Sequence, residues 1–307
     1  MAIKVITPGA FTTVQDLGRY GYQAVGIPCS GVMDQEAYRA ANWLLNQENE
    51  AVLEMTLFGG IYCFTEETFI ALTGADMEPK LNGKPCPMYR TIRVEKNALL
   101  HLGAARNGCR TYLAIQGGIA VPEVLGSRST NIKCQMGGFG GRVLRSGDEI
   151  PMGESQKEPE IRELPKVFYQ EEITLRVIEG PQADYFTEKG KETFYKETYT
   201  ISEESDRMGC RLMGPAIEAH GSTDIISDGI VFGSVQVTTA GLPIVLMADR
   251  QTTGGYAKIA AVCSFDLPLL AQSRPGNRVR FEKISLSKAH QILKERSEQG
   301  VFGGFKL

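Results

Sequence analysis

The sequence predicts a mainly β protein with a few short helices. Its apolar runs are short and are separated by Gly, Pro, Asn and Asp, which is the pattern of strands joined by turns. Asn82-Gly83 lies between two extended segments and signals a tight turn. Few segments show helical periodicity. The expected strands cover residues 68–72, 110–116, 173–178, 242–247 and 278–281.

The clearest helical pattern begins at Asp34. Its carboxylate can accept hydrogen bonds from the free N–H groups of a first helical turn. The apolar residues that follow recur on one face, as in an amphipathic helix packed on a sheet. They are Ala37, Ala40, Ala41, Leu44 and Leu45.

Two further helices are expected. One follows Ser287, with Gly300 as its stop, and its apolar side carries Ala289, Ile292 and Leu293. A shorter one is expected from Gly180-Pro181 to about Gly190, because Pro suits the first helical turn.

The composition changes between Met152 and Glu172, where Glu, Lys, Gln and Pro replace the apolar pattern. Such a segment is typical of an exposed connection. We therefore expect an N-terminal β domain at 1–155, a C-terminal β domain at 170–285, and a closing helix and tail at 286–307. We find no internal repeat of fixed period, which disfavours a solenoid or a propeller.

Charge and composition exclude several classes of function. The formal net charge is −3 and the isoelectric point is about 5.8, so the basic excess needed to bind nucleic acid or an anionic membrane is missing. The N-terminal segment lacks the apolar run of an export signal, and no run of eighteen apolar residues occurs, so we expect a cytoplasmic protein. The seven cysteines form no Cys-x-x-Cys pair, and with three histidines no metal site is predicted.

The polar segment 249–256, Asp-Arg-Gln-Thr-Thr-Gly-Gly-Tyr, follows a predicted strand. Two hydroxyls before two glycines would let the backbone turn its N–H groups inward as an anion-binding nest, and Gln251 could bind an amide or a carboxylate. The alternative is a β-turn in which the glycines only supply positive φ.

The segment 125–131, Leu-Gly-Ser-Arg-Ser-Thr-Asn, places one guanidinium among three hydroxyls and contains no acidic residue. Such donors favour a carboxylate or a phosphate. The Gly-rich segment 137–141 follows and could bring its backbone close to a ligand. The alternative is a surface loop followed by a Gly-rich hairpin.

Two other segments mix acidic and basic groups. In Ser205-Asp206-Arg207-Met208-Gly209, Asp206 could act as a base or orient Arg207, and the alternative is a structural ion pair at a turn. Asp34 is interpreted more simply as a helix cap than as a catalytic group.

The sequence lacks a Walker A loop, a Gly-x-Gly-x-x-Gly that opens a βαβ unit, and a Gly-x-Ser-x-Gly elbow. If ATP binds, it binds by another route. From the residues alone, the prediction is a β scaffold with polar loops suited to a small anion.

Seven ordered segments resemble those of the KipA-like family, also described as the C-type component of 5-oxoprolinase, as allophanate hydrolase subunit 2, or as part of the carboxyltransferase domain of urea carboxylase. The likeness runs nearly end to end. Its segments are 12–19, 30–34, 53–57, 71–75, 125–130, 205–209 and 249–256.

This resemblance implies two β-barrel domains, the second similar to cyclophilin. It also implies a KipI-like subunit and an amidohydrolase-like (LamB/YcsF-type) subunit as partners in an ATP-dependent 5-oxoprolinase that opens 5-oxo-L-proline to L-glutamate. ATP, with Mg as its counter-ion, would be the co-substrate of the complex. The chain would be inactive alone, and it could form a homo-oligomer.

Two alternatives stay open. The chain could be a biotin-dependent carboxyltransferase component that acts on urea or a related amide. It has no Met-Lys dipeptide, however, so no biotin is expected on this chain. The other alternative is a regulatory partner of a KipI-like inhibitor of a histidine kinase.

The residues expected to meet the ligand come from the segments above and from one predicted strand. The catalytic candidates are Asp206, Arg207 and Arg128. The substrate or anion-binding candidates are Asp34, Ser127, Ser129, Thr130, Gln236, Gln251, Thr252, Thr253, Gly254 and Gly255.

Overall fold

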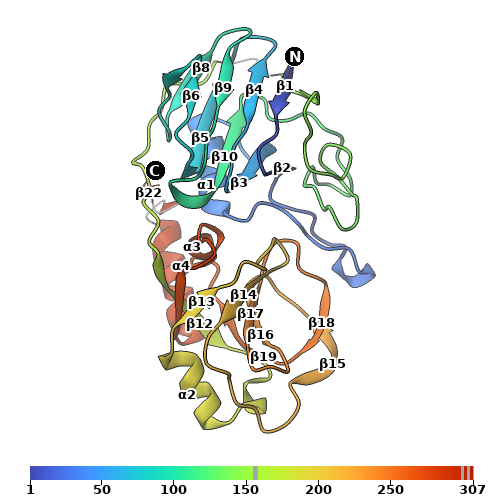
Figure 1. Cartoon of the computed structure of the whole chain (residues 1–307), viewed down its shortest axis with the longest axis vertical. Coiled ribbons are helices and arrows are strands. Elements are labelled where there is room, and N and C mark those ends of the chain that lie inside the picture. The colour runs from blue at the N-terminus through green and yellow to red at the C-terminus, as the bar shows by residue number, and fades with distance from the viewer. Residues whose placement is uncertain (155–157, 299–300, 303–304, 307) are drawn as a thin grey trace. The chain divides into compact units, whose positions relative to one another are not determined.

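The computed structural model describes residues 1–154, 158–298, 301–302 and 305–306. The chain forms two compact units, which are coloured along the chain in Figure 1. Unit 1 comprises Met1–Tyr20, Ser30–Tyr169 and the described residues after 300, and unit 2 comprises 21–29 and the residues from Gln170 onward. The short segment 21–29, which includes the 3-10 helix η1 (Gln23–Val25), is not anticipated by the sequence pattern.

Unit 1 contains two antiparallel sheets. The larger sheet has the order β11-β1-β4-β9-β6-β7, and the smaller one has the order β2-β3-β10-β5-β8. The strands of the larger sheet are β1 (Ala2–Thr7), β4 (Ile61–Phe64), β6 (Lys80–Leu81), β7 (Lys84–Pro85), β9 (Leu99–His101) and β11 (Glu149–Pro151). Those of the smaller sheet are β2 (Phe11–Gln15), β3 (Val52–Thr56), β5 (Thr68–Asp76), β8 (Thr91–Val94) and β10 (Asn107–Ile115).

The smaller sheet is buried on both faces, which explains why β5 and β10 are continuous apolar runs. In β10, Leu113 and Ile115 join the core shared by the two sheets, while Tyr112 and Ala114 join a second core against helix α1 (Gln35–Leu44). This alternation follows from the two-residue period of a strand. Unit 1 is therefore layered as sheet, sheet and helix.

Helix α1 confirms the predicted cap. The Asp34 carboxylate accepts hydrogen bonds from the N–H groups of Glu36 and Ala37 at 3.0 and 2.9 Å, and Asp34 is 2% exposed. The predicted apolar face is buried between the helix and the smaller sheet. Asn82-Gly83 also forms the predicted tight turn, with positive φ at both residues, between β6 and β7.

Unit 2 is a closed barrel with the order β12-β19-β16-β17-β14-β13-β20. It closes through a parallel pair between β12 (Glu172–Glu179) and β20 (Arg278–Lys283), in register from Glu172↔Arg278 to Val177↔Lys283. Its other strands are β13 (Tyr199–Ile201), β14 (Gly209–Met213), β16 (Ser234–Val237), β17 (Pro243–Leu246) and β19 (Lys258–Val262). Two strands outside the barrel, β15 (Asp224–Gly229) and β18 (Thr253–Tyr256), pair with each other.

The helices of unit 2 pack against the barrel strands. Helix α2 (Glu188–Lys196) places Phe194 in a stacked contact with Phe281 of β20, with ring centroids 4.4 Å apart. The barrel is also accompanied by α3 (Leu267–Ala271) and α4 (Leu286–Glu298). Helix α4 matches the helix expected after Ser287, and Gly300, its expected stop, lies outside the described residues.

The helix expected from Gly180 to Gly190 is wrong in its extent. Residues 183–185 form only the 3-10 helix η2 (Ala183–Tyr185), and α2 starts afterwards at Glu188. Thr187 is the reason, because its hydroxyl accepts from Gly190 N at 3.0 Å and caps a new helix there.

The mainly β prediction with few helices is confirmed, and all five expected strands lie on observed ones. One barrel is closed, whereas the sheets of unit 1 form two open layers. No described helix is long and apolar enough to cross a membrane. Near the end of the chain, β21 (Val301–Phe302) pairs with β22 (Phe305–Lys306).

Candidate functional site

Asp16 joins two of the polar segments of unit 1. Its Oδ1 accepts from the hydroxyls of Ser127 at 2.7 Å and Ser129 at 2.5 Å, and its Oδ2 accepts from Arg128 N at 2.5 Å. Gly18 N also donates to Oδ1 at 2.9 Å. The segments 12–19 and 125–130 therefore form one hydrogen-bonded unit, although more than a hundred residues separate them.

The hydroxyls of Ser127, Ser129 and Thr130 are used within the chain. The three residues are 0–1% exposed, and Thr130 Oγ1 donates to Val14 O at 2.8 Å. Since a buried hydroxyl needs a partner, Asp16 and the backbone of β2 satisfy these groups. The hydroxyls hold the loop to β2.

Arg128 differs from its sequence-based interpretation. The segment 125–131 contains no acid, but the fold brings Glu123 to 3.1 Å from Arg128 Nη2, and Nε donates to Val121 O at 3.1 Å. The expectation of a guanidinium without a neutralising acid is therefore wrong. The acid comes from the residues just before the segment, and Asp16 receives its backbone N–H.

The Gly-rich segment 137–141 packs on this loop. A Cβ at Gly137 would lie 2.2 Å from Ser129 O, and one at Gly138 would lie 1.9 Å from Thr130 Oγ1. Below these glycines, buried Arg19 donates to Val124 O and Ser129 O, both at 2.9 Å. Gly is required here because backbone approaches backbone.

A second cluster of unit 1 lies at the start of α1. Glu54 of β3 is 1% exposed, and its Oε2 accepts from Met33 N at 2.8 Å and from the Tyr112 hydroxyl at 2.9 Å. The Tyr112 hydroxyl accepts from Asp34 N at 2.8 Å. Burial raises the pKa of Tyr112 well above its usual value, and the nearby Glu54 and Asp34 charges add to the effect. Sequence reasoning missed Glu54 as a functional candidate, although a carboxylate within the apolar strand 52–56 was a visible signal.

In unit 2, Arg207 is oriented by Asp249. Arg207 is 6% exposed, and its Nε and Nη2 donate to the two carboxylate oxygens of Asp249 at 2.9 and 3.1 Å. Asp206 instead caps the local turn, accepting from Met208 N and Gly209 N at 2.8 and 3.1 Å. The sequence pointed to a role for Asp206 beside Arg207, and the fold supplies the partner from a segment 42 residues later.

The segment 252–255 is neither the expected nest nor a turn. Thr253 to Tyr256 form β18, and Gly254 and Gly255 do not have positive φ. Pairing with β15 uses the backbone groups that a nest would turn toward an anion. Gly254 is needed for another reason: a Cβ there would lie 2.5 Å from Ile230 Cδ1 and 2.7 Å from Gln236 Nε2.

Gln236 and Lys258 form a polar cluster beside β18. They are paired across β16 and β19, and are 5% and 4% exposed. Gln236 Nε2 donates to Tyr256 O at 3.1 Å, while Lys258 Nζ donates to Asp228 Oδ2 at 2.6 Å and to Gly229 O at 3.2 Å. The hydrogen bond from Lys258 lowers the pKa of the exposed Asp228 carboxyl, and the N–H of Gly229 lowers it further.

Lys258 was not among the predicted site residues. Its signal was a lysine at the start of the apolar run 258–262, since a fully buried ammonium requires a partner. Gln182 completes the cluster, with Nε2 3.3 Å from Asp228 Oδ2 and Oε1 accepting from Lys258 N at 3.2 Å. Gln251 and Thr253 are exposed next to this region, and Thr252 is half-buried.

The clusters provide amide, ammonium and guanidinium donors beside carboxylates. This combination suits a small ligand that carries an amide or a carboxylate. Among the described residues, no group of His, Cys, Asp and Glu side chains could hold a metal ion.

These features define a two-unit β protein with polar clusters on both units. Residues 25–283 match the family model described as "Carboxyltransferase domain, subdomain A and B", and the chain belongs to this family. The resemblance seen in the sequence is thereby confirmed.

Two relatives match nearly end to end, and both are named as the C-type component of 5-oxoprolinase. The one from Escherichia coli is 37% identical over 97% of this chain and 95% of its own length. The one from Haemophilus influenzae is 37% identical over 94% of each chain. The urea amidolyase of Lachancea kluyveri is 34% identical over 98% of this chain but only 18% of its own length.

The solved structures agree. The urea carboxylase of Kluyveromyces lactis aligns with a TM-score of 0.91 and 31% identity over 99% of this chain and 29% of that one. The protein TTHA0988 aligns with a TM-score of 0.84 and 30% identity over 92% of this chain and 56% of that one. This chain thus spans only about a third to a half of these two proteins.

Proposed function

We propose that this chain is one component of an ATP-dependent 5-oxoprolinase that opens 5-oxo-L-proline to L-glutamate. The observation that carries the proposal is the nearly full-length match to two proteins that are named as 5-oxoprolinase components. Unlike the urea amidolyase relatives, these proteins have about the length of this chain. Their names describe one subunit among several, which supports a multi-subunit assembly, and we propose the KipI-like and amidohydrolase-like subunits as its other members.

The substrate presents a lactam amide and a carboxylate. Opening the ring adds water across the lactam C–N bond, and negative charge develops on the carbonyl oxygen as that bond breaks. ATP, with Mg as its counter-ion, is the proposed co-substrate of the complex that activates the carbonyl. Fixed donors in a site shielded from water stabilise such charge more than water does.

Lys258 is our choice for this donor in unit 2. Its ammonium has three N–H donors, of which Asp228 and Gly229 use two within the described part of the chain. The third can donate to a carbonyl or carboxylate oxygen. Gln236 lies across the strand pair from Lys258 and brings an amide to the same cluster.

The carboxyltransferase alternative has its own support. Urea amidolyase and putative urea carboxylase relatives match 93–98% of this chain. Since this chain has no biotinylation motif, a carboxyltransferase role would require carboxybiotin from a separate carrier.

Substrate dependence distinguishes the two functions. The test combines the chain with KipI-like and amidohydrolase-like subunits from the same organism, and measures ATP hydrolysis with 5-oxo-L-proline or with urea. We expect 5-oxo-L-proline to stimulate hydrolysis only when all subunits are present. In a parallel assay, carboxyl transfer between free carboxybiotin and urea should be absent. Transfer to urea without stimulation by 5-oxo-L-proline would overturn the proposal in favour of the alternative.

A further inference from the structure

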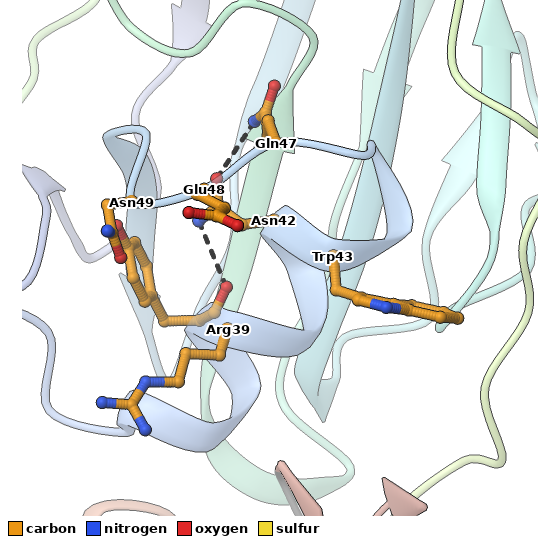
Figure 2. A pocket seen from close by; sticks show the side chains of 7 residues that line it. Arg39, Asn42, Trp43, Gln47, Glu48 and Asn49 are labelled. Atoms are coloured by element: carbon orange, nitrogen blue, oxygen red, sulfur yellow. Dashed lines mark hydrogen bonds between the residues drawn. The ribbon is translucent and has the colours of Figure 1, made fainter. Parts of the chain in front are cut away.

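A pocket in unit 1 lies apart from the polar clusters described above. It has a volume of about 240 Å³ and is formed by α1 and the loop that follows it (Figure 2). None of the predicted site residues lines it. Its lining residues are Tyr38, Arg39, Asn42, Trp43, Gln47, Glu48 and Asn49.

The wall of the pocket is fixed by two amides. Asn42 is 2% exposed, and its Nδ2 donates to Tyr38 O at 3.3 Å and to Glu50 O at 3.2 Å. Gln47 Nε2 donates to Asn42 Oδ1 at 3.1 Å and to Ile115 O at 3.0 Å. Figure 2 shows the bonds that join Asn42 to Gln47 and to the helix backbone. Because these amides hold the loop against α1, the pocket is preformed.

Trp43 forms an aromatic side of the pocket. The Arg162 guanidinium lies 4.7 Å from the centroid of its ring, and Arg162 Nη1 donates to Trp43 O at 2.9 Å. The ring is thus held in place by a residue outside the pocket. An apolar ligand group can pack on this side without reordering the chain.

The rim of the pocket carries opposite charges. Arg39 and Glu48 are both exposed lining residues, with the amide of Asn49 beside them. Glu48 forms no ion pair within the part of the chain that the structure describes. Arg39 offers five N–H donors, more than a single partner uses. In Figure 2, Trp43 lies across the pocket from the charged side chains.

We propose that this pocket binds a free α-amino acid with an apolar side chain about the size of leucine. Arg39 would bind the carboxylate, Glu48 the ammonium, and Trp43 the side chain. The pocket is smaller than most drug-sized sites, which fits a ligand of this size. The site does not depend on the proposed reaction, because all its groups belong to unit 1 of this chain.

The test measures calorimetric binding of L-leucine to the purified chain. We expect saturable binding, weakened about 10-fold or more by Arg39→Gln and by Glu48→Gln, in line with the loss of one charge-assisted contact. The control variants Arg93→Gln and Glu67→Gln remove the charges of an exposed ion pair elsewhere in unit 1, and should bind as the parent does. N-acetyl-L-leucine and L-leucinamide, which each lack one charge, should bind at least about 10-fold more weakly.

Two results would overturn the site. One is the absence of saturable L-leucine binding to the folded parent chain. The other is equal affinity for L-leucine and N-acetyl-L-leucine, since Glu48 would then have no ammonium partner. Circular dichroism of each variant shows that it is folded. Because the assay uses no ATP and no other protein, its failure is separate from a failure of the proposed reaction.

Discussion

Single residues decide how the polar segments are used. Asp16 accepts four hydrogen bonds and joins β2 to the loop at 127–129. A sequence pattern shows that such residues are present, but it does not show that a carboxylate 113 positions away satisfies Ser129. For the same reason the guanidinium of Arg128 looked uncompensated in the sequence. The cap at Asp34 was predictable because its partners are only two and three residues away.

Gly254 and Gly255 provide a residue-scale test of the barrel cluster. Gly254→Ala places a Cβ 2.5 Å from Ile230 Cδ1 and 2.7 Å from Gln236 Nε2, so these side chains must shift. We expect the free energy of unfolding to fall by about 1–3 kcal/mol, as for overpacking. At Gly255 the nearest atom is Ile225 O at 3.5 Å, so Gly255→Ala is the matched control and should change it by less than about 0.5 kcal/mol. Urea unfolding measures both, and equal losses would contradict the packing role of Gly254.

Elements with local signals were predictable, and elements with distant partners were not. The strands 68–72 and 173–178 and helix α1 follow from periodicity and caps. The segment 252–255 was misread, because Thr-Thr-Gly-Gly has the composition of a turn, and only the partner strand β15 makes it extended. Lys258 and Glu54 were missed because each lies in an apolar strand, where the pattern emphasises the hydrophobic neighbours.

The turn between Arg142 and Asp148 gives a pH prediction at the scale of one element. Arg142 donates to both oxygens of Asp148 at 2.7 and 2.8 Å, and holds the pKa of that carboxyl below its usual value. Partial burial opposes this shift, and Arg145 N adds to it. Since the folded pKa is depressed, the pair stabilises the fold above the unfolded pKa of about 3.9 and loses this effect as the pH falls through the folded value.

Asp148→Asn should therefore lower the free energy of unfolding by about 2 kcal/mol at pH 7. The difference between parent and variant should stay constant down to about pH 5 and shrink at lower pH. Urea unfolding at several pH values measures it. Glu149→Gln, which removes an exposed ion pair with Lys4 on the next residue, is the control and should cost less than about 1 kcal/mol. A difference that grows below pH 4 would contradict the assigned shift.

At the scale of the whole molecule, composition predicted the β class, and the ordered motifs predicted the family. The family motifs meet in pairs: 12–19 with 125–130, 30–34 with 53–57, and 205–209 with 249–256. Local composition cannot reveal these pairs, because each depends on how strands are ordered in a sheet or barrel. The assignment of 21–29 to unit 2 was equally hidden.

The most direct test of the proposed function is the rate at which the reconstituted complex forms L-glutamate from 5-oxo-L-proline and ATP. We expect glutamate to form with this chain and not without it, and Lys258→Met to lower the rate about 100-fold, as the loss of a fixed donor to a developing oxyanion does. Lys283→Met, which breaks an exposed ion pair with Glu179 in unit 2, should leave the rate unchanged. Glutamate formation at the same rate without this chain would contradict the proposal, and an unchanged rate in Lys258→Met would contradict the assignment of Lys258.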